Sequence, residues 1–185
     1  MENLQPTKGT LLLAEPFMLD PNFKRSVVFI CEKQRTGSVG FILNRPMPLN
    51  LSEAIEGVID FDAPLYYGGP VQTDTLHFIH NIGERLEGSI EIIDGLYWGG
   101  DFETLKTMIN AGEVKPENFR FFLGYSGWDL TQLDGEMEEK SWITHEANAG
   151  HVFALQPENL WKEVLKEMGG QYAMMINYPE DPTLN

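Results

Sequence analysis

Two short segments carry side chains or backbone amides of the kind that hold anions. Asn44-Arg45-Pro46 follows an apolar run, so the Arg45 guanidinium is expected at the end of a strand, where it could bind a carboxylate or a phosphate. Gly68 and Gly69 form a predicted turn between two strands. Because glycine has no Cβ, the amides of such a turn can approach a ligand closely. Both segments therefore predict contacts to an anion.

A third segment offers an aromatic face beside the start of a helix. The Trp128 indole precedes Asp129 and Gln132, whose spacing is typical of a capping box. We therefore predict that a helix begins just after Asp129, with its N-terminus close to the Trp128 ring. This arrangement would add an indole face and a helix N-terminus to the same binding surface.

The three segments are predicted to meet in one solvent-facing site for a small anionic ligand or a peptide partner. Each segment also has a structural explanation, which stays open: one turn, a second turn, and a capped helix with a core tryptophan. No reaction follows from these residue types, so we expect a binding or regulatory module rather than an enzyme, without catalytic residues. The predicted binding residues are Asn44, Arg45, Pro46, Gly68, Gly69, Trp128, Asp129 and Gln132.

Catalytic alternatives rest on one serine and one pair of carboxylates. Ser126 stands in a glycine-rich stretch, but a nucleophile elbow needs glycine two positions after the serine, and Trp128 stands there. The carboxylates of Asp129 and Glu136 leave a carboxylate-dependent hydrolase as the alternative function.

Metal and nucleotide sites find little support in the residue pattern. Among the four histidines, His77 and His80 are the one close pair, and their odd spacing in a predicted strand directs the rings to opposite faces. Residues 83–89 have the glycine spacing of a phosphate-binding loop but lack its lysine. We predict neither a metal site nor a cofactor.

The length and charge of the chain limit the remaining classes of function. The chain has 185 residues, with 13 Lys and Arg against 28 Asp and Glu and a formal net charge of −15. Such a chain repels nucleic-acid phosphates, so direct nucleic-acid binding is not expected. The hydrophobic fraction of 42% suffices for one compact core. With a single cysteine, Cys31, and no signal-like or membrane-spanning run, we expect a cytoplasmic protein without a membrane partner.

Strand patterns outnumber helix patterns along the chain. Most links between strands are too short for a crossover helix, which favours antiparallel pairing. We predict an α+β domain with a mixed, largely antiparallel, curved or barrel-like sheet flanked by three or four helices. The predicted strands cover residues 10–14, 27–31, 39–43, 65–67, 76–80, 89–93, 118–124 and 142–145, and the predicted helices begin near residues 50, 101, 129 and 157.

Five stretches taken together resemble the YqgE/AlgH family of small bacterial proteins. They are GTLLLAEP at 9–16, DPNFKRSVV at 20–28, GSVGFILNRP at 37–46, YGGPV at 67–71 and GYSGWDLTQL at 124–133. The resemblance implies a single α+β domain over residues 1–176, followed by a C-terminal extension at 177–185. It implies no settled biochemical function. Some members are labelled transcriptional regulators, which leaves a regulator acting on DNA as a second alternative.

Overall fold

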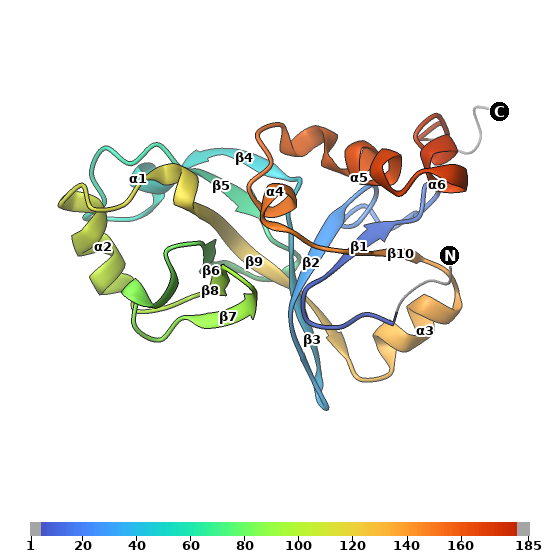
Figure 1. The fold of residues 1–185 in the computed structure, drawn as a ribbon, viewed down its shortest axis with the longest axis horizontal. Helices are drawn as coiled ribbons and strands as arrows, with labels where there is room; N and C mark the ends of the chain where they lie inside the picture. Colours follow the sequence, from blue (N-terminus) through green and yellow to red (C-terminus); the bar gives the residue numbers. More distant parts are fainter. Residues whose placement is uncertain (1–4, 181–185) are drawn as a thin grey trace.

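The structure is a computed structural model that describes residues 5–180 (Figure 1). Its strands are β1 (Thr10–Ala14), β2 (Val27–Gln34), β3 (Gly37–Ile42), β4 (Pro46–Asn50), β5 (Pro64–Tyr67), β6 (Val71–His80), β7 (Ile90–Ile93), β8 (Leu96–Trp98), β9 (Phe119–Asp129) and β10 (Trp142–Glu146). Its α-helices are α1 (Leu51–Ala54), α2 (Phe102–Asn110), α3 (Gln132–Glu138), α4 (Ala149–Val152), α5 (Leu160–Met168) and α6 (Gly170–Met175).

The described strands form one curled ten-stranded sheet. Its main path runs β10-β1-β2-β3-β9-β6-β8-β7, while β5 pairs with β9 and β4 pairs with β5. The β5–β9 pairing is parallel and the others are antiparallel. The long strand β9 joins the two halves of the sheet, because it pairs with β3, β5 and β6. The predicted α+β class and largely antiparallel sheet are confirmed.

Alternate side chains of β1 enter two different cores. Leu11 and Leu13 pack in the core that α5 covers, whereas Leu12 and Ala14 face a second core on the α3 side. Because neighbouring residues of a strand point to opposite faces, a strand covered on both faces is apolar throughout. A third core lies beneath α2, against β6 and the first half of β9 (Figure 1).

Two of the predicted helix starts are confirmed by their caps. Asn50 caps α1 in a capping box with Glu53, and the Asp101 carboxylate caps α2 by accepting from the Thr104 amide at 2.8 Å. Helices α3 and α5 also begin near residues 129 and 157, but without a side-chain cap. The capping box predicted for Asp129 and Gln132 is corrected: Thr131 is the N-cap of α3, and the Gln132 side chain donates to Glu136 instead of to a backbone amide. The structure adds the short helices α4 and α6. Helices α5 and α6 lie together over the β1 and β2 side of the sheet in Figure 1.

Strand β9 runs further than predicted, to Asp129 instead of ending at Gly124. The two glycines of the 124–127 stretch suggested a turn, but this stretch is paired with β3, where Gly40 lies opposite Ser126. Gly124 has a φ of +71°, which a residue with a Cβ would adopt only under strain. Trp128 therefore lies within a strand, and the prediction that it stands beside a helix N-terminus is corrected: a turn separates it from α3.

The predicted extension at 177–185 is described only as far as residue 180, so residues 181–185 lie outside the described residues. Over the described part, the Tyr178 ring stacks on Phe17 with ring centroids 5.5 Å apart. Between residues 5 and 180, no helix has the length and apolar character needed to cross a bilayer.

Candidate functional site

Four basic side chains surround a hollow between the loop after β1, the end of β3 and the start of α5. Lys24 and Arg25 belong to the loop, Arg45 follows β3, and Lys162 belongs to α5. The hollow has a volume of about 420 Å³, and we call it the basic hollow. Its lining consists of Pro21, Lys24, Arg25, Asn44, Arg45, Glu158, Asn159, Trp161, Lys162 and Glu180.

The buried side chain of Asn44 fixes the loop that forms one wall of the basic hollow. Its Oδ1 accepts from the Val27 amide at 2.9 Å, and its Nδ2 donates to the Arg25 carbonyl at 2.9 Å. Between these contacts, Arg25 has a φ of +53°, a left-handed conformation that costs a non-glycine residue about 1–3 kcal/mol. The two hydrogen bonds of Asn44 therefore help to hold a strained residue in place.

The Arg25 guanidinium lies on the Trp161 indole, with its Cζ 4.7 Å from the ring centroid. Its Nη2 donates to the Tyr178 carbonyl at 2.6 Å. The buried Nε has no hydrogen-bond partner among the described residues. Arg25 is thus held by an aromatic ring and one carbonyl, and neither contact supplies a negative charge.

Arg45 is held in a similar way. Its Nη2 donates to the Lys24 carbonyl at 2.6 Å, which joins the end of β3 to the loop. A guanidinium has five N–H donors. Within residues 5–180 this contact is the one hydrogen bond of the Arg45 side chain, so the described part of the chain leaves donors of Arg45 available for a ligand. Arg45 is half-buried, and its carbonyl also accepts from the Tyr67 amide at 2.9 Å.

The charge around the basic hollow is unbalanced. Four of the 13 Lys and Arg residues line it, together with two carboxylates, Glu158 and Glu180. Over residues 5–180, none of the four cations has a carboxylate oxygen within 4.0 Å. In a protein with a net charge of −15, this is a local concentration of positive charge that no carboxylate of the described residues pairs with.

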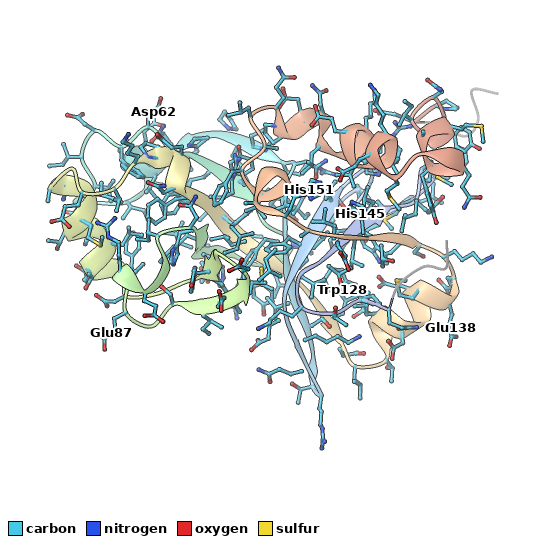
Figure 2. The ribbon with its side chains drawn as sticks, viewed as in Figure 1. Asp62, Glu87, Trp128, Glu138, His145 and His151 are labelled. Atoms are coloured by element: carbon cyan, nitrogen blue, oxygen red, sulfur yellow. The ribbon has the colours of Figure 1, made fainter. Side chains whose placement is uncertain are left out.

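Trp128 lies in the core on the α3 side of the sheet and is 5% exposed (Figure 2). Its indole Nε1 donates to the Glu136 carboxylate at 2.9 Å, and the Trp142 Nε1 donates to the same oxygen at 2.7 Å. The other Glu136 oxygen accepts from Gln132 at 3.0 Å. One carboxylate thus joins two core tryptophans to α3.

Asp129 shapes the turn between β9 and α3. Its Oδ1 accepts from the amides of Thr131 at 3.1 Å and Gln132 at 2.9 Å. The hydrogen bond from the Gln132 amide is the main cause that holds the pKa of Asp129 below its usual value. In this structure the carboxylate serves the turn that starts α3.

Gly68 and Gly69 lie where β5 passes close to β9. The Gly68 amide donates to the Leu123 carbonyl at 2.9 Å, and its carbonyl accepts from Ser126 Oγ at 3.0 Å. A Cβ on either glycine would clash with the backbone of β9. Within this structure the two glycines allow close strand packing, and the buried Ser126 hydroxyl takes part in it.

The structure brings part of the predicted site into the basic hollow. Asn44 and Arg45 line it, while the exposed Pro46 begins β4 beside it. Tyr67 links this region to the tryptophan cluster, by which we mean Trp128 and Trp142 with Glu136. The Tyr67 amide donates to the Arg45 carbonyl, and the Tyr67 side chain packs against the core that contains Trp128. The other predicted residues are outside the lining: Pro46, Gly68, Gly69, Trp128, Asp129 and Gln132.

Sequence reasoning missed three cations of the basic hollow: Lys24, Arg25 and Lys162. Lys24 and Arg25 form the one adjacent basic pair in the sequence, and this pair was an available signal. Lys162 offered no such signal, because it stands among acidic residues on α5.

The sequence pattern of AlgH-like proteins matches residues 11–173, from β1 into α6. The chain belongs to the AlgH-like family. A UPF0301 protein of Chlorobaculum tepidum is 48% identical over 184 residues, which cover 100% of this AlgH-like chain and 97% of the relative. A UPF0301 protein of Cytophaga hutchinsonii is 46% identical over 180 residues, which cover 97% and 99%. The resemblance predicted from five stretches is confirmed.

Two solved structures are similar to this AlgH-like chain. The solution structure of the AlgH protein from Pseudomonas aeruginosa matches with a TM-score of 0.73 at 31% identity, covering 97% of this chain and 98% of that one. The crystal structure of protein DIP2367 from Corynebacterium diphtheriae matches with a TM-score of 0.81 at 22% identity, covering 96% and 95%. The second likeness concerns the fold alone. None of these names states an activity, so the function of the AlgH-like chain is argued from its own residues.

Proposed function

We propose that this AlgH-like protein is a binding module for a small anion, held in the basic hollow by Lys24, Arg25, Arg45 and Lys162. One observation carries the proposal: these four cations line a single hollow, and none has an ion-pair partner within residues 5–180. Like charges gathered in one place repel each other, so an anion that binds among them relieves that repulsion and gains charge-assisted hydrogen bonds.

The size and walls of the basic hollow suit a small molecule. Its volume of about 420 Å³ falls within the range of about 300–1,000 Å³ that is usual for ligand sites. Two guanidinium groups can each bind a phosphate or a carboxylate through two parallel hydrogen bonds. We favour a small anion over a peptide because the cations surround one hollow instead of following an extended groove.

Direct DNA binding is opposed by the charge of the whole chain. The four cations share the basic hollow with Glu158 and Glu180, and the protein carries a net charge of −15. A duplex presents a long row of phosphates and needs a basic stripe to match it. We expect no duplex binding even near ~50 mM salt, where phosphate contacts are strong.

A carboxylate-dependent hydrolase would have to use Asp129 and Glu136. Both oxygens of Glu136 accept hydrogen bonds, from Trp128, Trp142 and Gln132. The Oδ1 of Asp129 accepts three, from Thr131 and Gln132. A catalytic base needs a lone pair directed at substrate, so we rank the hydrolase below the anion-binding module.

Thermal denaturation tests the proposal with inorganic phosphate, pyrophosphate and citrate at constant ionic strength. At least one anion is expected to raise the Tm saturably, and comparison of pyrophosphate with citrate separates a phosphate site from a carboxylate site. Arg45→Gln should abolish that increase. Arg35→Gln removes the same charge at the exposed turn after β2 and should retain it. No saturable increase with any of the three anions, or an increase that Arg45→Gln retains in full, contradicts the proposal.

A further inference from the structure

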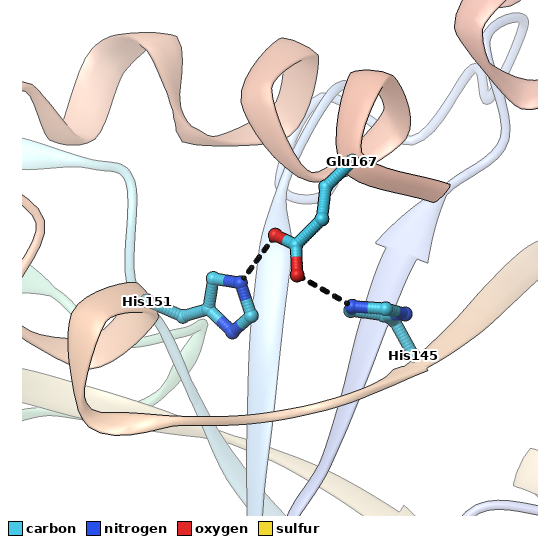
Figure 3. Close-up of side chains that lie close together, drawn as sticks. All are labelled: His145, His151 and Glu167. Carbon is cyan, nitrogen blue, oxygen red and sulfur yellow. Dashed lines mark hydrogen bonds and ion pairs between the residues drawn. The ribbon is translucent and has the colours of Figure 1, made fainter. Parts of the chain in front are cut away.

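Two histidines and a glutamate from three different elements converge beside α5 (Figure 3). His145 belongs to β10, His151 to α4 and Glu167 to the last turn of α5. The Nε2 of His151 lies 3.0 Å from one Glu167 oxygen, and the Nε2 of His145 lies 3.5 Å from the other. One nitrogen or oxygen atom from each residue lies within 4.8 Å of the other two.

The fold holds two of these side chains at separate anchor points. His145 stands opposite Leu11 in the β1–β10 pairing, which fixes its backbone in the sheet. His151 is 6% exposed and completes the capping box of α4, where its Nδ1 accepts from the Asn148 amide at 3.2 Å. The two rings meet edge to face with centroids 5.7 Å apart. Glu167 is the exposed member of the group.

We propose that His145, His151 and Glu167 form a binding site for a divalent transition metal such as Zn²⁺. Two imidazole nitrogens and one carboxylate oxygen are a donor set that suits Zn²⁺, Co²⁺ and Ni²⁺, whereas Mg²⁺ and Ca²⁺ prefer oxygen ligands. Metal–ligand bonds of about 2.0–2.2 Å require the three atoms to lie within about 4.4 Å of one another. Because the three atoms already lie within 4.8 Å, small side-chain movements suffice to close them around an ion. Three protein ligands leave a further position open to water or another ligand.

The hydrogen bonds of His151 define what must change when the metal binds. The Asn148 amide donates to Nδ1, so the neutral ring carries its proton on Nε2, which faces Glu167. A metal at Nε2 replaces that proton. The neutral ring then carries its proton on Nδ1. The hydrogen bond from the Asn148 amide breaks, because the amide N–H and the Nδ1–H are both donors. Metal binding is therefore coupled to the amide of Asn148, and this coupling is a specific signature of the site.

Calorimetric titration of Zn²⁺ and Co²⁺ into the full chain, prepared without a histidine tag and dialysed against chelator, tests the proposal. We expect one equivalent to bind with a Kd below about 10 μM. Glu167→Gln and His145→Gln should each weaken binding at least about tenfold. Glu138→Gln removes an exposed carboxylate of α3, away from the cluster (Figure 2), and should leave binding unchanged.

Nuclear magnetic resonance separates a metal site from a cluster that is only hydrogen-bonded. With Zn²⁺, the ring signals of His145 and His151 and the amide signal of Asn148 should shift together, and Glu167→Gln should abolish these shifts while the metal-free spectrum stays that of a folded protein. The proposal is overturned if no saturable binding occurs, or if the variants bind as the unmodified chain does. It is also overturned if the variants change the stability of the protein without weakening metal binding.

Discussion

The side-chain amide of Asn44 donates to the carbonyl of Arg25 at 2.9 Å, across the junction between the end of β3 and the loop after β1. The same side chain accepts from the Val27 amide at 2.9 Å. These contacts place Arg25 and the neighbour of Asn44, Arg45, on the same hollow. Asn44, which the sequence predicts as a ligand contact, thus also positions the two guanidinium groups that the proposed function requires.

Replacing Asn44 should destabilise the fold and release the loop that forms one wall of the basic hollow. Asn44→Ala leaves the buried Val27 amide without its acceptor, and we expect a loss of about 1–3 kcal/mol in the free energy of unfolding, measured by urea denaturation. Asn159→Ala is the control. This residue of the same hollow is exposed, and within residues 5–180 its side chain hydrogen-bonds only to the Gln156 side chain, so the variant should change stability by less than about 0.5 kcal/mol. Equal stability of the two variants would contradict the anchoring role of Asn44.

Glu136 is expected to be the polar centre of the tryptophan cluster. Glu136→Gln presents an uncharged acceptor to the indoles of Trp128 and Trp142. The free energy of unfolding should fall by about 1–2 kcal/mol, because a hydrogen bond to a neutral group is weaker than one to a charged group. The emission of these tryptophans should change as well. Glu138→Gln alters an exposed carboxylate of the same helix and should be close to neutral. If both variants lower the free energy of unfolding equally, the hydrogen bonds from the two indoles to Glu136 make no specific contribution to stability.

The stability of the protein should fall in mild acid because of His80. Its Nε2 lies 2.9 Å from the Gly99 carbonyl and therefore carries the proton of the neutral ring, while its buried Nδ1 has no partner among the described residues. Burial lowers the pKa of His80, and the bond to Gly99 offsets this in part. Between that lowered pKa and the usual value near ~6.5, the unfolded chain binds more protons, so the free energy of unfolding rises with pH.

The measurement is urea denaturation between pH 5 and pH 8, on the unmodified chain and on His80→Gln. The unmodified chain should lose stability as the pH falls below about 6.5 and change little above that value. His80→Gln should show a smaller loss over the same interval, with the remaining part due to groups such as His77, whose pKa burial also lowers. Identical pH profiles for the two proteins would exclude His80 as a cause.

Gly68 should not tolerate a side chain. Gly68→Ala places a Cβ against the carbonyl oxygen of Gly124, and crowding of this kind costs about 1–3 kcal/mol or more. The matched variant is Gly135→Ala in α3, where a Cβ meets no atom within 4 Å and should stabilise the helix by up to about 1 kcal/mol. Thermal denaturation of both variants should therefore give Tm changes of opposite sign. A neutral Gly68→Ala would show that β5 and β9 can separate at little cost.

The local pattern was sufficient to predict strands that are covered on both faces. Residues 10–14 were predicted with the bounds that β1 has, because a short, nearly apolar run in a sheet-rich chain is typical of a strand buried on both sides. The C-terminal end of β9 was not predicted, because there the local pattern is misleading. Gly124 and Gly127 are typical of turns. The reason for glycine at position 124 is the close approach of the Gly69 and Val71 backbone, which only the folded chain reveals.

Sequence analysis predicted only those residues of the basic hollow that their neighbours in sequence could place. Arg45 could be placed at a strand end from its neighbours in sequence. The meeting of Arg25 with Lys162, 137 positions later, depends on how α5 packs over the sheet. The same applies to His145, His151 and Glu167, which belong to three elements. Periodicity identifies elements, but the crossing of distant elements follows from packing that a single sequence does not display.

The most direct test of anion binding is a titration of the isotopically labelled protein with inorganic pyrophosphate and, separately, with citrate, followed by nuclear magnetic resonance. At least one anion should cause saturable shifts centred on the amides of Lys24, Arg25 and Arg45 and on the Trp161 indole, with little change around Trp128. Saturable shifts centred elsewhere, or none with either anion, would contradict the claim that the basic hollow is the functional site of this protein.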